Sequence, residues 1–282
     1  MRVISRWADG GVEVFDESLE PCRSFPVPPE VEGWAVPASR DSLIHAIGNT
    51  VIRIGPGAEE RWRCDLSLRE RPTAWPSAVT LSADETRIWV YAPGREDGHD
   101  AWFVLDAGTG REIRRYRLPT GGQRGQQFPV RDGSMLLSVS RGQDGWATYR
   151  AGPDGTVHDY AWDDRALVDL SPDQRQFMTV DHWQEDVAFH DFADGAVRFR
   201  IGAEAFGLDR PDVEYAGGYL DDETAIVVAV ADDDSWRHFR VGARTGEVLG
   251  DLGIMTIDEY DLQPLGDGTY VITDTDGTLR RM

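Results

Sequence analysis

The sequence predicts an all-β protein in which several similar antiparallel sheets follow one another, and two recurring patterns support this. The first is a strand–turn–strand hairpin, whose best copies span residues 104–112 and 239–247. A unit repeated along a chain indicates one supersecondary structure used many times. The weaker copies span residues 149–155, 189–195, 53–59 and 15–20.

The second pattern is a turn that precedes each hairpin, clearest at residues 81–85 and 170–174. Asp, Gly, Ser and Pro dominate these segments because they form local hydrogen bonds or adopt unusual backbone angles. One aspartate marks each turn, with a period of about 45 residues: Asp41, Asp84, Asp132, Asp173, Asp222 and Asp267.

Short apolar or alternating runs lie between the two patterns, at residues 87–91, 135–139, 176–180 and 225–229. Such runs are typical of strands. Each unit therefore contains four strands, A to D, with turns between A and B and between C and D. Four strands in about 45 residues are the signature of a β-propeller blade, so we expect a β-propeller of four-stranded antiparallel blades.

Two motifs carry a resemblance to a known superfamily: Ser171–Pro172–Asp173 before a B strand, and the Asp106-to-Gly110 turn with Thr109–Gly110. With the repeat, they make the chain resemble the WD-repeat and YVTN-type β-propellers over nearly its full length. The resemblance implies the propeller fold.

The number of blades depends on the two ends of the chain. The period favours six blades, with the two termini joining to close the ring, because an open propeller exposes sheet edges. The alternative is seven blades, two of them incomplete. It rests on three strand-like segments at each end: 2–7, 12–15 and 22–27, then 260–263, 269–273 and 278–281.

The composition predicts one β-propeller domain over residues 1–282. The sequence contains no apolar run of 18 residues and no apolar segment at its start, so we expect no membrane span and a cytoplasmic protein. Cys22 and Cys64 are the only cysteines, and we expect free, buried thiols, with a structural disulfide between them as the alternative.

The charge is strongly acidic, with 50 Asp and Glu against 29 basic residues, all arginine, and a net charge of −21. This charge repels phosphate backbones and argues against nucleic acid binding. The absence of lysine excludes Schiff-base chemistry. The arginine-rich run at residues 111–117 is expected to protect the edge of a D strand.

An Asp-x-Trp motif recurs at the start of three C strands and provides the first candidate site. We expect it to form a partner-binding patch, because B–C loops share one face of a propeller and Trp is a strong interface anchor. The alternative is packing between blades for the indoles and turn capping for the acids. The residues are Asp100, Trp102, Asp144, Trp146, Asp234 and Trp236.

Aromatic residues near the start of several A strands provide the second candidate. A strands line the central channel of a propeller, so these side chains are candidates for a pocket at its mouth that binds a small apolar or sugar-like ligand. Packing between blades is the alternative. The residues are Trp34, Trp75, Phe128, Tyr215 and Tyr260.

Catalytic and metal-binding signals are weak. His182 and His190 bracket a loop with Glu185 and Asp186, but their spacing matches no recognised ligand pattern. The acidic loops lack the spacing of a calcium loop. We therefore expect no catalytic residue, metal or cofactor, and a non-catalytic scaffold that binds a basic protein or peptide. The alternative is a small-molecule-binding propeller, or a propeller lyase or hydrolase, acting at the channel mouth.

Overall fold

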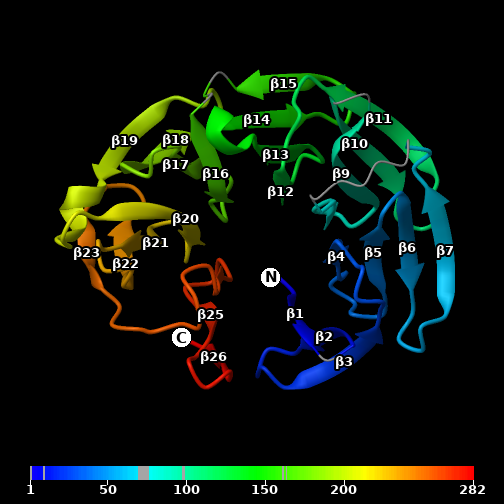
Figure 1. The fold of residues 1–282 in the computed structure, drawn as a ribbon, viewed down its shortest axis with the longest axis horizontal. Coiled ribbons are helices and arrows are strands. Elements are labelled where there is room, and N and C mark those ends of the chain that lie inside the picture. The colour runs from blue at the N-terminus through cyan, green and yellow to red at the C-terminus, as the bar shows by residue number, and fades with distance from the viewer. Residues whose placement is uncertain (1, 9, 69–75, 97–98, 161, 163) are drawn as a thin grey trace. The chain divides into compact units, whose positions relative to one another are not determined.

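The computed structural model describes residues 2–8, 10–68, 76–96, 99–160, 162 and 164–282 (Figure 1). The described strands form seven antiparallel sheets, five of four strands and two of three, and each sheet is one blade. Two short 3-10 helices, η1 (Gly142–Asp144) and η2 (Ala203–Phe206), are the only helices in these ranges. The prediction of an all-β fold with four-stranded antiparallel blades is confirmed.

The prediction of six blades is wrong, because the described residues form seven sheets. The six-blade count assumed that the two terminal segments share one sheet. Each terminal segment instead has its own turns and hydrogen-bonded ladder, and forms a separate three-stranded sheet. The expected closure of a ring by the termini is not shown.

The chain divides into two compact units, and the N-terminal unit spans Val3–Asp163 with blades 1 to 4. Blades 1 and 2 contain β1 (Ile4–Ala8), β2 (Gly11–Phe15), β3 (Pro21–Pro26), β4 (Gly33–Ala35), β5 (Leu43–Ile47), β6 (Thr50–Ile54) and β7 (Glu60–Asp65). Blades 3 and 4 contain β8 (Ala78–Leu81), β9 (Arg87–Glu96), β10 (His99–Asp106), β11 (Glu112–Leu118), β12 (Arg124–Pro129), β13 (Met135–Ser140), β14 (Trp146–Ala151) and β15 (Val157–Tyr160).

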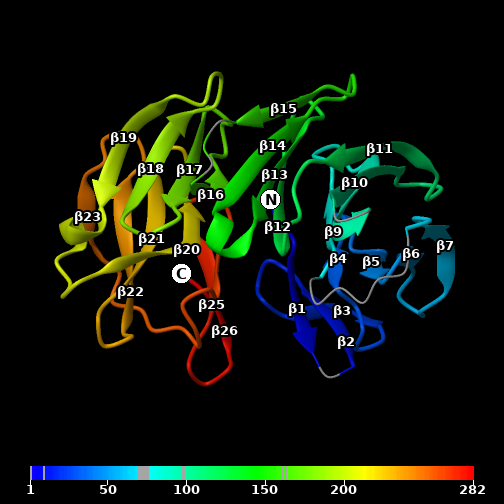
Figure 2. The same ribbon diagram turned by 45° about the horizontal axis from the view of Figure 1, so that its top comes forward.

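The C-terminal unit comprises Asp164–Met282 together with Met1–Arg2, and contains blades 5 to 7 (Figures 1 and 2). Blades 5 and 6 contain β16 (Arg165–Leu170), β17 (Gln176–Asp181), β18 (Asp186–Asp191), β19 (Val197–Gly202), β20 (Asp212–Tyr219), β21 (Thr224–Val230), β22 (Trp236–Gly242) and β23 (Val248–Asp251). Blade 7 contains β24 (Leu262–Pro264), β25 (Tyr270–Thr273) and β26 (Leu279–Arg281).

The hydrophobic core of each unit lies between neighbouring sheets. Phe189 of blade 5 and Tyr219 of blade 6 belong to one buried cluster, with ring centroids 6.0 Å apart. Phe103 of blade 3 belongs to a cluster shared with blade 2. Because both faces of an inner blade are covered, its middle strands are apolar throughout rather than alternating, as in β21, where five consecutive residues are buried.

The aspartate turns lie between the first and second strands, as predicted, and are held by local hydrogen bonds. Asp84 accepts hydrogen bonds from the hydroxyls of Ser82 (2.6 Å) and Thr86 (2.9 Å). Hydrogen bonds from Ser82 and Thr86 lower the pKa of the Asp84 carboxyl. This local satisfaction explains why Asp and Ser recur in these turns.

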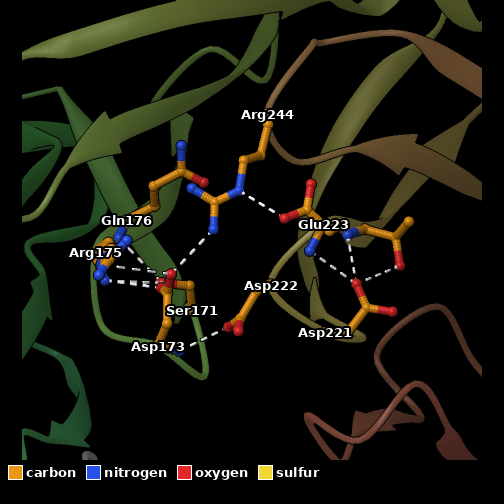
Figure 3. A network of polar contacts seen from close by, with 9 residues as sticks. Ser171, Asp173, Arg175, Gln176, Asp221, Asp222, Glu223 and Arg244 are labelled. Carbon is orange, nitrogen blue, oxygen red and sulfur yellow. Dashed lines mark hydrogen bonds and ion pairs between the residues drawn. The ribbon is translucent and has the colours of Figure 1, made fainter.

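In the C-terminal unit, one arginine connects two of these turns (Figure 3). Arg244 donates hydrogen bonds to Asp173 of blade 5 and Glu223 of blade 6, both at 3.0 Å. Burial alone would raise the pKa of Asp173, but hydrogen bonds from the Arg175 N–H, Ser171 and Arg244 outweigh it and lower that pKa. Blades 5 and 6 are thus fastened at the end that carries the A–B turns.

The two cysteines are unpaired, as expected, but half-buried rather than buried. No helix in the described part of the chain is long and apolar enough to cross a membrane.

Candidate partner-binding surface

The first Asp-x-Trp motif lies inside the N-terminal unit. Asp100 is buried, and its carboxylate accepts hydrogen bonds from the hydroxyls of Tyr91 (2.8 Å) and Thr120 (2.6 Å). It also accepts hydrogen bonds from the backbone N–H groups of Gly94 (2.7 Å) and Gly122 (2.9 Å). Asp100 therefore fastens the loop between blades 3 and 4 to the start of β10.

Trp102 of the same motif is fully buried. Its indole Nε1 donates a hydrogen bond of 2.7 Å to Gln127, and its ring packs against Trp89 at a centroid distance of 4.8 Å. In this conformation neither Asp100 nor Trp102 is accessible to a partner, and the two residues serve the packing of blades 3 and 4.

The other two motifs have exposed acids and half-buried indoles. Asp144 and Trp146 are at the B–C loop of blade 4 in the N-terminal unit. Asp234 and Trp236 occupy the same position of blade 6 in the C-terminal unit, where the Trp236 indole donates to Thr256 (3.1 Å). The three motifs thus share a place in the blade but not an environment.

The channel-mouth candidates are also divided between the units. Trp75 lies outside the described residues. In the N-terminal unit, Trp34 of β4 and Phe128 of β12 are half-buried. In the C-terminal unit, Tyr215 of β20 is half-buried, while Tyr260, just before β24, is 52% exposed.

Tyr215 and Tyr260 join a loop that the sequence reasoning did not assign to partner binding. This is the B–C loop of blade 5, residues 181–186, and its Trp183 is 72% exposed. The Tyr215 hydroxyl donates to the backbone oxygen of His182 (2.6 Å). Glu214 of β20 accepts hydrogen bonds from Gln184 (3.0 Å) and from the Tyr260 hydroxyl (2.8 Å).

The loop before β24 adds two exposed apolar side chains, Met255 at 54% and Ile257 at 55%. We call Trp183, Glu214 and Tyr260 the Trp183 surface; Met255 and Ile257 precede Tyr260 in the same loop. Exposed aromatic side chains on one surface are typical of protein interfaces. The hydrogen bonds of Glu214 hold the two loops together.

An acidic hollow of about 480 Å³ borders the Trp183 surface. It is lined by Glu185, Asp186, Arg200, Gly202, Ala203, Glu204, Pro211 and Asp212. Arg200 pairs with Asp186 at 3.3 Å. Glu185, Glu204 and Asp212 form no ion pair in the part of the chain that the structure describes. Their carboxylates leave the hollow with an excess of negative charge.

The acidity of this region reflects the whole C-terminal part of the sequence. Residues 164–282 contain 26 acidic residues and 10 arginines, so they carry −16 of the net charge of −21. A concentration of negative charge attracts basic partners and accelerates their association.

Hydrogen bonds within the loop of Trp183 hold it in one conformation. Asp181 accepts hydrogen bonds from the backbone N–H of Trp183 (3.0 Å) and of Asp186 (2.8 Å). Asp186 pairs with the buried Arg165 of β16. A loop that is already ordered loses less conformational entropy when it binds.

A buried hydrogen-bonded chain continues from Arg165 across blade 5. Its Nε donates to the Thr179 hydroxyl (2.7 Å), which lies 2.8 Å from Nε2 of His190. Nδ1 of His190 lies 3.0 Å from the oxygen of Gly195, so it must carry the proton, and Nε2 accepts from Thr179. Burial lowers the pKa of His190 to about 4, which keeps the ring neutral.

This role of His190 differs from a catalytic or metal-binding one. His190 is committed to Thr179 and Gly195 inside the blade, whereas His182 lies in the loop. Within the described ranges, no three His, Cys, Asp or Glu side chains lie close enough together to hold a metal ion.

Sequence reasoning missed Trp183, Met255 and Ile257. The available signal was the run Trp183 to Asp186, which combines an indole with two acids in a short B–C loop. Met255 and Ile257 carried no signal, because two apolar residues between strands are equally typical of packing under a loop.

Comparison with solved structures supports the fold. Hydrazine synthase of Kuenenia stuttgartiensis is similar with a TM-score of 0.67 and 13% identity, over 97% of this chain and 89% of that one. The β-propeller domain of Cps50 (Swd1) from Myceliophteria thermophila is similar with a TM-score of 0.63 and 10% identity, over 99% and 92%. At such identities the likeness shows a β-propeller fold alone.

A third similar structure is BBS1N, solved in complex with ARL6DN, with a TM-score of 0.60, 12% identity, and coverage of 99% of this chain and 85% of that one. No protein-family model and no curated protein matches the sequence.

Proposed function

We propose that this chain is a non-catalytic scaffold that binds a basic segment of a protein or peptide on the Trp183 surface. The observation that carries the proposal is the exposed Trp183 on an ordered loop beside the acidic hollow. Trp183 provides the apolar anchor, and Glu185, Glu204 and Asp212 receive arginine or lysine side chains. Propellers commonly present such loop surfaces, and BBS1N, one of the similar structures, was solved with another protein bound.

The apolar anchor, Trp183, and the surrounding carboxylates are expected to affect binding in different ways. Truncating a large aromatic anchor removes most of its buried area and costs about 2 kcal/mol or more, roughly a thirtyfold loss of affinity. Neutralising a rim carboxylate mainly slows association and reduces its dependence on salt. The two kinds of variant therefore give different kinetic signatures.

The proposal is tested by selecting binders from a phage-displayed library of random peptides. We expect enrichment of sequences in which Arg or Lys flanks an apolar residue. Trp183→Ala should weaken the selected peptides by roughly thirtyfold with an unchanged melting temperature. Trp7→Ala, in the N-terminal unit, is the matched control because Trp7 is also exposed, at 42%. Enrichment without basic residues, or equal binding to Trp183→Ala, would contradict the proposal.

A further inference from the structure

A second hollow lies in the N-terminal unit, at the start of three neighbouring A strands. It has a volume of about 290 Å³, close to the lower end for small-molecule pockets. β4, β8 and β12, from blades 2, 3 and 4, each contribute a wall. The lining residues are Glu32, Gly33, Trp34, Pro76, Ser77, Ala78, Val79, Arg124 and Gly125.

Two glycines allow the close packing of the walls of this hollow. A Cβ at Gly33 would lie 2.5 Å from the backbone oxygen of Ser77, so only glycine lets β4 approach β8 this closely. A Cβ at Gly125 would lie 2.4 Å from the ring of Tyr91. Glu32 ties the walls together, because its carboxylate accepts hydrogen bonds from the N–H groups of Ser77 (2.9 Å) and Gly48 (3.2 Å).

Trp34 provides an oriented aromatic wall. Its indole N–H is engaged with the Ser5 hydroxyl at 3.1 Å, and its ring packs against Trp7 with a centroid distance of 6.1 Å. The hydrogen bond fixes the ring, so the indole contributes apolar surface to the hollow rather than a donor. Ala78 and Val79 add to the apolar lining.

Two polar groups of the lining lack partners among the described residues. Ser77 is only 2% exposed, and its hydroxyl forms no hydrogen bond with these residues. The guanidinium of Arg124 is exposed and forms no hydrogen bond or ion pair there. The protein encloses the Ser77 hydroxyl, whereas the Arg124 guanidinium is open to a ligand in the hollow.

We propose that this hollow binds a small organic acid that contains a flat ring, a function distinct from partner binding on the Trp183 surface. The ring packs on Trp34 and the carboxylate pairs with Arg124. Guanidinium–carboxylate pairs can be bidentate, which favours a carboxylate over a neutral group.

The direct test titrates the intact protein with benzoate and phenylacetate as ring acids, benzyl alcohol as a neutral ring, and acetate as an acid without a ring. The readout is the indole N–H signal of Trp34 in a ¹⁵N spectrum, assigned with Trp34→Phe. We expect saturable shifts with a ring acid and none with benzyl alcohol or acetate. Absence of a saturable shift with both ring acids, or equal shifts with the neutral ring, would overturn the proposal.

Two variants separate binding from structure. Arg124→Gln should weaken the ring acid about tenfold, while Arg117→Gln, at an exposed arginine of β11 in the same unit, should leave it unchanged. Ser77→Ala removes an enclosed, unpaired hydroxyl, so it should leave binding unchanged and leave the melting temperature unchanged or raise it. Unchanged binding in Arg124→Gln would refute this assignment.

Discussion

The two units are built from the same kind of blade but differ sharply in charge. The C-terminal unit, residues 1–2 and 164–282, contains 26 acidic residues and 11 arginines, whereas residues 3–163 contain 24 and 18, so the net charges are −15 and −6. The sheets do not require this difference, because the strands of both units are equally apolar at their centres. Charge is therefore a property of the loops and outer strands, where the fold leaves composition free.

The B–C ends of two blades also differ, in the burial of their side chains. In blade 3 of the N-terminal unit, the aspartate and tryptophan at the start of the third strand, Asp100 and Trp102, are buried. In blade 5 of the C-terminal unit, Trp183 of the equivalent B–C loop is exposed beside the acidic hollow. One blade design thus supports either internal fastening or an open surface, depending on whether the following loop covers the B–C end.

The largest effect that tests this contrast is expected at Asp100. Asp100→Ala removes the acceptor of four donors in a buried site and should lower the free energy of unfolding by about 3 kcal/mol or more. Asp144→Ala, at the exposed equivalent in blade 4, should change it by about 0.5 kcal/mol or less. Urea denaturation measures both, and equal effects would show that Asp100 does not fasten the loop.

A second effect compares the buried histidines of the two units, His190 in blade 5 and His45 in blade 2. Burial lowers the pKa of each to about 4, from about 6.5 in the unfolded chain. The unfolded state then binds more protons between these values, so stability is full above about pH 6.5 and falls as the pH approaches 4. At roughly 1.4 kcal/mol per pKa unit, each histidine contributes about 3 kcal/mol to this acid sensitivity.

The measurement is the free energy of unfolding of the native chain and of His190→Gln as a function of pH. We expect the variant to be less stable at neutral pH, because Gln replaces the hydrogen bonds to Thr179 and Gly195 poorly, yet less sensitive to acid. His158→Gln, at an exposed histidine of β15, should keep the native pH profile. If His190→Gln also kept that profile, the ring would not be neutral and buried as described.

The blade architecture was predictable from the sequence because its signals are local. Asp84 forms its hydrogen bonds within two residues of itself, so the turn is visible in four or five letters of sequence. The strand runs between turns were equally local. The blade number was not predictable in this way, since it depends on whether the first and last segments pair with each other.

The site residues depended on contacts that no local pattern reveals. Asp100 is buried because the loop before β12 returns over it, and Gly122 permits this: a Cβ there would lie 2.2 Å from the Tyr91 hydroxyl. Trp183 is exposed on a short loop whose backbone N–H groups bond to Asp181. The Asp-x-Trp motif identifies the start of a strand. Whether its side chains are exposed depends on the loop that leads to the next blade, as the bonds of Thr120 and Gly122 to Asp100 show.

The smallest expected effect on stability compares two arginines that pair with aspartate turns, Arg244 in the C-terminal unit and Arg61 in the N-terminal unit. Arg244 bridges Asp173 and Glu223 at 3.0 Å, and its side chain is 32% exposed (Figure 3). Among the described residues Arg61 pairs with Asp41 alone, at 3.5 Å, and the Asp41 side chain is 53% exposed. Solvent screens both, so we expect Arg244→Gln to cost about 1 kcal/mol of unfolding free energy and Arg61→Gln about half of that or less.

The pH dependence distinguishes an ionic fastening by Arg244 from a merely steric one. Asp173 has a lowered pKa in the folded protein, so its ionic contribution is present above its unfolded pKa and disappears as the pH falls through the folded value. The stability difference between native and Arg244→Gln proteins should therefore shrink in acid and in high salt. If the difference persisted unchanged under both conditions, Arg244 would act through the packing of its aliphatic part rather than its charge.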